Sequence, residues 1–267
     1  MKPYIAVFKL RVINGLQYRI AALAGVATQF VWGFMYIMIF EAFYRGFSGT
    51  QAISLEQLAT YIWLQQAFLY FLYLWLKETE ISESITSGSI AYELCRPCGI
   101  YGFWFAKLIA HRLSGTLLRC APILVIAFFL PIPYRLSLPP DPLTFLLFVV
   151  TLLLGLIVVI SLSMLAYISI FVTMSPIGSF LVFSVVGEFF SGFVLPIPLM
   201  PIWLQNIVYL LPFRLSVDLP FRVYSGNIPT NDAIIGILTQ IIWIIVLIAV
   251  GKFLLTKMLK RVVVQGG

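Results

Sequence analysis

Six long apolar runs constrain the fold of this chain more than any other feature of its sequence. Each run is long enough to cross about 30 Å of hydrocarbon as a helix. With 61% hydrophobic and 10% charged residues among 267, the chain cannot bury its apolar surface in the core of a water-soluble domain. The sequence therefore predicts an all-α polytopic membrane protein with six transmembrane helices. The predicted spans cover residues 20–40, 58–76, 113–130, 143–171, 177–193 and 234–255.

The positive residues predict the orientation of these spans. With the N-terminus inside the cell, most Lys and Arg fall in cytoplasmic segments, and those left outside are Arg45, Arg135, Arg214 and Arg222. Both termini are therefore expected to be cytoplasmic. The net charge of +7 is scattered between apolar blocks, which argues against a nucleic-acid partner.

The chain is expected to form one transmembrane domain over residues 1–267, surrounded by membrane lipid. Its predicted parts are an interfacial helix (1–19), spans one and two (20–76), a cytoplasmic loop (77–112), spans three to five (113–193), an external re-entrant segment (194–232), span six (233–256) and a cytoplasmic tail (257–267). The first part is amphipathic, because Ile5, Phe8, Val12 and Leu16 share one stripe of a helix and Arg11 lies away from it. The alternative is an ordinary basic lead-in to span one.

A proline-rich apolar segment, 195–213, could form a seventh span. A seventh span would place the basic C-terminal residues outside, and its four prolines would interrupt backbone hydrogen bonds that lipid cannot replace. The segment is therefore expected to be re-entrant or interfacial, with a short helix over 201–211. Trp203 and Tyr209 would be its interfacial anchors.

The predicted cytoplasmic loop contains two apolar pairs at helical spacing, with a glycine between them and an Arg-Pro step after them. The residues are Ile81 and Ile85, Gly88, Ile90 and Leu94, and Arg96 and Pro97. This pattern predicts two short helices joined at Gly88. They would form a rigid surface through which a cytoplasmic protein could move the membrane helices. The alternative is a loop that floats at the membrane surface.

Four of the polar residues predicted inside the hydrocarbon are candidate site residues. Arg119 and Glu188 would each cost about 2.5 to 3.5 kcal/mol at a helix centre, so they either pair with each other or line a translocation path. Gln65 and Gln66 lie in span two. Amides at such depth usually hydrogen-bond between helices, and these two are the candidates for contact with a transported substrate.

Two segments resemble the permeases of ABC type-2 exporters. The first matches the pattern I..G.I...L.RP at Ile85, Gly88, Ile90, Leu94, Arg96 and Pro97. The second, 191–213, is similar to the family's proline-rich segment before the last span, at Gly192, Pro196, Pro201, Trp203, Pro212 and Phe213. Together with the six-span layout, the resemblance covers nearly the whole chain.

The resemblance implies a half-transporter of the bacterial cytoplasmic membrane. Two such permeases pair, either identical or sisters from an operon that encodes two permeases and one ATPase, and each docks an ABC ATPase that binds ATP and Mg. The coupling helix would lie between spans two and three, around 83–94. The ATPase-coupling residues would be Glu83, Ile85, Gly88, Ile90, Leu94, Arg96 and Pro97, and the external gate segment would contain Pro196, Pro201, Trp203, Pro212 and Phe213.

The chain shows no catalytic or metal site of its own. It has no G-x-x-x-x-G-K-[ST] phosphate loop, so ATP hydrolysis is expected in a partner, and no cofactor is expected here. Cys95 and Cys98 have metal-ligand spacing, but His111 is the single histidine and four ligands are needed. The alternative function is a passive channel or an ion-coupled secondary transporter that uses Arg119 and Glu188. An intramembrane enzyme would need paired acids or an activated nucleophile, and the sequence shows neither.

Overall fold

A computed structural model describes residues 2–17, 19–46 and 51–260. Over those ranges the chain is helical and contains no strand. Four of its helices are long and apolar enough to cross a membrane, and they match predicted spans one, three, four and six. They are α2 (Arg19–Gly46), α7 (Ile100–Phe128), α8 (Pro142–Thr173) and α12 (Thr230–Leu259). The fold is that of a polytopic membrane protein.

Helix α8 is the centre of the bundle and packs against α12, α9 (Pro176–Phe190) and α7. Local chemistry fixes its ends. The Asp141 carboxylate accepts from the Thr144 backbone N–H at 2.8 Å, which caps the helix and holds the pKa of Asp141 below its ordinary value. Met174 ends the helix in the left-handed conformation (φ 49°), and Ser175 then caps α9 ahead of Pro176. These caps set the α8–α9 hairpin.

The second predicted span is broken in the structure. A continuous helix was expected over 58–76, but α3 (Leu55–Ala67) stops before Phe68, and α4 (Leu69–Leu72) is a single turn followed by non-helical backbone. Every residue of α3 from Leu58 on is buried within the protein. Non-helical backbone at membrane depth is tolerated only where protein covers it. The break therefore depends on partners from other helices, described below.

The fifth predicted span is also short. Helix α9 has 15 residues, which is about 22 Å at 1.5 Å per residue and less than the hydrocarbon thickness. The chain then turns at Gly192 (φ 83°) and continues through four short helices. These are η1 (Ile197–Leu199), α10 (Ile202–Leu210), η2 (Phe213–Leu215) and α11 (Asp218–Tyr224).

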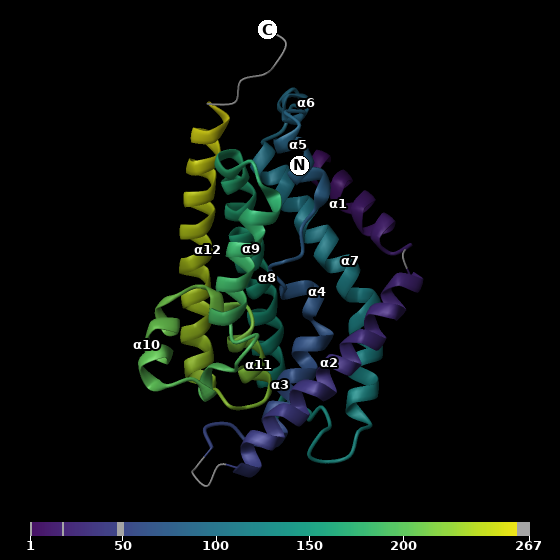
Figure 1. The fold of residues 1–267 in the computed structure, drawn as a ribbon, viewed down its shortest axis with the longest axis vertical. Coiled ribbons are helices and arrows are strands. Elements are labelled where there is room, and N and C mark those ends of the chain that lie inside the picture. Colours follow the sequence, from purple (N-terminus) through teal and green to yellow (C-terminus); the bar gives the residue numbers. More distant parts are fainter. Residues whose placement is uncertain (1, 18, 47–50, 261–267) are drawn as a thin grey trace.

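The segment between α9 and α12 folds back into the bundle. Helix α11 is buried along most of its length and packs against α8, α3 and α12. Helix α10 occupies the predicted place of a short helix over 201–211 and lies level with the lower half of α12 in Figure 1. Its Ile202, Trp203 and Leu210 side chains are exposed, which leaves an apolar outer face. The prolines therefore separate short helices and do not lie within one continuous helix.

The N-terminal helix α1 (Lys2–Gly15) packs along α7. Tyr4 and Val7 touch the core, and Arg11, predicted to lie away from the apolar stripe, lies against the protein. Ile5, which belongs to the predicted apolar stripe, is 64% exposed. The physical reason is that Arg11 finds carboxylates on the protein side, whereas apolar side chains are free to face lipid.

The loop that was predicted over residues 77–112 is shorter in the structure. It holds α5 (Thr79–Thr86) and α6 (Ile90–Leu94), joined through Gly88 at φ 75°, and α7 already begins at Ile100. Thus 100–112 is helix and not loop. In Figure 1 the start of α1 and the end of α12 lie at the same end of the molecule as α5 and α6.

Gly192 provides a test of the turn after α9. We expect Gly192→Ala to destabilise the fold by about 1 to 3 kcal/mol, because φ is positive and a Cβ would lie 2.8 Å from the Tyr61 hydroxyl oxygen. Thermal unfolding in detergent measures the loss. Gly46→Ala is the control, since no described atom lies within 4 Å of a Cβ at that helical position. Equal losses in the two variants would contradict this account of the turn.

Candidate functional site

The candidate site is the helical hairpin α5–Gly88–α6, residues 79–94, which we call the coupling hairpin. The predicted ATPase-coupling residues, which include Arg96 and Pro97 just after the hairpin, divide into two groups by exposure. Ile85 and Ile90 point into the protein with 5% and 1% exposure, so they hold the hairpin in place. The exposed group consists of Glu83, Gly88, Leu94, Arg96 and Pro97. Tyr92 is also exposed, at 80%. It was not among the predicted coupling residues, because it does not belong to an apolar pair at helical spacing.

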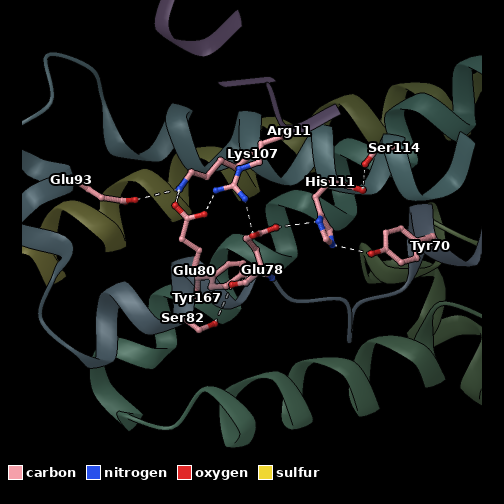
Figure 2. A network of polar contacts seen from close by, with 10 residues as sticks. All are labelled: Arg11, Tyr70, Glu78, Glu80, Ser82, Glu93, Lys107, His111, Ser114 and Tyr167. Atoms are coloured by element: carbon pink, nitrogen blue, oxygen red, sulfur yellow. Dashed lines mark hydrogen bonds and ion pairs between the residues drawn. The ribbon is translucent and has the colours of Figure 1, made fainter. Parts of the chain in front are cut away.

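Behind the hairpin lies a buried lysine that joins its two helices (Figure 2). Lys107 of α7 has a 2% exposed side chain, and its Nζ lies 2.8 Å from Glu80 Oε1 and 3.3 Å from Glu93 Oε1. Glu80 belongs to α5 and Glu93 to α6. The Trp104 indole N–H also donates to Glu93. One cation therefore ties both arms of the hairpin to α7.

A second group of charges ties the hairpin to α1. Arg11 forms ion pairs with Glu78, at 3.3 Å, and with Glu80. The other oxygen of Glu78 lies 3.1 Å from Nδ1 of His111, whose Nε2 lies 3.1 Å from the Tyr70 hydroxyl. Figure 2 shows this row of side chains running from Glu93 to Tyr70.

A third anchor comes from α8. The Tyr167 hydroxyl accepts the Glu78 backbone N–H just before α5 begins. A buried hydrogen bond is electrostatically stronger than one in water. The coupling hairpin is thus fastened to α1, α7 and α8 at once.

Arg112 explains the break in span two, and it was expected to be a simple cytoplasmic charge. Its side chain is buried, with 1% exposure. The guanidinium donates to the carbonyl oxygens of Phe71 (3.3 Å), Tyr73 (2.8 Å) and Leu76 (3.5 Å), and to Ser163 Oγ at 3.0 Å. These carbonyls lose their helical partners where α4 ends. No sequence signal distinguishes this arginine from its basic neighbours.

The four polar residues predicted in the hydrocarbon do not gather at one place. Gln65 donates to the Phe193 carbonyl, the interhelical role expected of such amides, and Gln66 is buried beside it. Arg119 stacks over the Tyr70 ring at 4.5 Å. Glu188 is half-buried on α9, and no ion pair joins it to Arg119 in the described part of the chain.

The predicted external gate residues lie at the starts of the short helices after α9. Pro196, Pro201 and Pro212 directly precede η1, α10 and η2, positions where a missing N–H is tolerated. Trp203 is exposed on α10, and Phe213 of η2 packs on Phe190 with ring centroids 6.4 Å apart.

A family model described as ABC-2 family transporter protein matches residues 30–266. The chain belongs to the ABC-2 transporter family. Among curated proteins, none matches it. As an ABC-2 family member it is a membrane permease of an ABC transporter, a class that generally works with an ATPase partner. The matched range includes the coupling hairpin and the segment from α9 to α12, and it begins after α1.

Proposed function

We propose that this ABC-2 permease is the membrane-spanning subunit of an ATP-driven exporter in a bacterial cytoplasmic membrane. It would form half of a translocation path with a second permease, identical or sister, and couple to a separate ABC ATPase that binds ATP and Mg. The observation that carries the proposal is the coupling hairpin, which exposes Tyr92 and Leu94 while ion pairs to α1 and α7 and a buried hydrogen bond to Tyr167 of α8 fasten it to three body helices.

The proposed topology has six crossings. Helices α2, α7, α8 and α12 supply four, and the broken pair α3–α4 and the short α9 supply the other two. The excess of Lys and Arg near the α5–α6 end favours a cytoplasmic position for that end. Closure of the ATPase dimer would push the hairpin, and α7 and α8 would then shift against the re-entrant segment to change access.

A direct test replaces the exposed hairpin residues in the permease co-expressed with its ATPase. We expect Tyr92→Ala with Leu94→Ala to reduce permease-stimulated ATP hydrolysis and transport about tenfold or more, because exposed aromatic and aliphatic anchors carry most of an interface's binding energy. Vanadate-sensitive hydrolysis in proteoliposomes measures the effect.

The matched control is Leu138→Ala, which replaces another exposed apolar residue, between α7 and α8. The melting temperature of the isolated permease is expected to stay the same in both variants, since exposed substitutions change stability little. Wild-type hydrolysis and transport in the hairpin variant would refute the coupling role.

A further inference from the structure

A cleft of about 400 Å³ lies between residues of α1, α2 and α7. Its basic side chains are Arg11 and Arg119, and Asn14, Tyr70, His111 and Ser114 also line it. The transport mechanism proposed above does not use this cleft. The only carboxylates near its polar walls in the described residues are those of Glu78 and Glu80, which already face Arg11 and His111.

Arg119 is the cation in this cleft that lacks a counter-charge. It takes part in no ion pair in the described part of the chain, and its buried Nε has no hydrogen-bond partner there. The guanidinium lies over the Tyr70 ring at 4.5 Å, a contact that leaves the edges of the fork free to bind an acceptor. Gly25 of α2 makes room for it, because a Cβ there would lie 3.2 Å from the guanidinium carbon.

The surroundings of the cleft select the kind of anion. Exposed apolar residues neighbour its apolar lining residues in the chain: Ile20 and Leu23 lie close to Ala22 on α2, and Leu117 precedes Leu118 on α7. A basic cleft between apolar flanks matches a molecule that carries an anionic head and hydrocarbon chains. Guanidinium groups bind phosphate oxygens in pairs, and the neutral amide of Asn14 supplies a further donor.

We infer that this cleft binds the phosphodiester headgroup of an anionic phospholipid, with the phosphate on Arg119 and the acyl chains along α2 and α7. The phosphate supplies the missing counter-charge. The lipid would belong to the cytoplasmic leaflet, and only that assignment rests on the orientation in the proposed function.

The test measures lipid retention and thermal stabilisation of the full chain purified in detergent. Phosphatidylglycerol is added to delipidated protein, and phosphatidylcholine and inorganic phosphate are added in parallel. We expect phosphatidylglycerol to raise the melting temperature and to remain bound in native mass spectrometry, with little effect of the other two probes. Equal stabilisation by inorganic phosphate would overturn the lipid assignment, and equal stabilisation by phosphatidylcholine would overturn the role of the charge.

Two variants locate the site. Arg119→Gln is expected to weaken phosphatidylglycerol binding about tenfold or more, because the charged fork is lost. If that variant fails to fold, Asn14→Glu provides the test. It adds a negative charge at an exposed position on the rim of the cleft, so it is also expected to weaken phosphatidylglycerol binding. The control is Arg135→Gln, an exposed arginine in the α7–α8 connection. Unchanged binding in Asn14→Glu and in any folded Arg119→Gln would overturn the inference.

Discussion

Arg112→Leu is expected to destabilise this permease strongly. The substitution removes the donors for three backbone carbonyls and for Ser163 in a water-poor interior. Each buried acceptor left unsatisfied costs about 1 to 3 kcal/mol, so the loss should exceed about 3 kcal/mol. That is a large part of the roughly 5 to 15 kcal/mol that stabilises most folded proteins. Fluorescence-detected size-exclusion chromatography and thermal melts in detergent measure the outcome.

Arg112→Lys separates charge from geometry. An ammonium keeps the charge but cannot span the three carbonyls as a planar fork does, so we expect a melting temperature between those of the wild type and Arg112→Leu. The exposed Arg135→Leu is the control and should melt with the wild type. If Arg112→Leu melts as the wild type does, Arg112 does not hold the broken span.

Lys107→Met is the second substitution with a large expected effect. It leaves the Glu93 carboxylate, with a 9% exposed side chain, without its cation. Removing one partner of a buried ion pair costs about 3 to 5 kcal/mol. Because the same lysine joins α5 and α6 to α7, we also expect ATPase stimulation to fall with stability. Thermal melts and coupled hydrolysis measure the two effects.

A second change distinguishes the loss of the pair from a loss of packing. In Lys107→Met with Glu93→Gln the uncompensated charge is gone, and the amide oxygen can still accept from Trp104. We expect this double variant to regain at least about 1 kcal/mol over Lys107→Met alone. Lys257→Met on the exposed side of α12 should have no effect. Strictly additive losses would show that Lys107 and Glu93 do not stabilise each other.

The long helices were predictable because their signal is local. Apolar runs of sufficient length form α2, α7, α8 and α12, and apolar pairs around Gly88 form α5 and α6. The four prolines of the segment after α9 likewise exclude a continuous span. In each case the residues that decide the structure lie within a few turns of one another.

The contacts that build the site were not predictable in this way. Arg11 meets Glu78 across 67 positions, and Arg112 meets Tyr73 across 39. A sequence pattern shows that a charge needs a partner but does not say which charge it finds. For the same reason hydropathy alone could not reveal the break at Phe68, because the residues around it are as apolar as those of a continuous helix.

The wide separation of Arg112 from the carbonyls it binds also bears on biosynthesis. A chain made from its N-terminus exposes Tyr73 before the ribosome has added Arg112, 39 residues later, and Ser163 follows 51 residues after that arginine. During this interval the backbone groups after α4 have no partner in their own helix. We therefore expect the α3–α4 segment to reach its final conformation only after α7, and then α8, has been made.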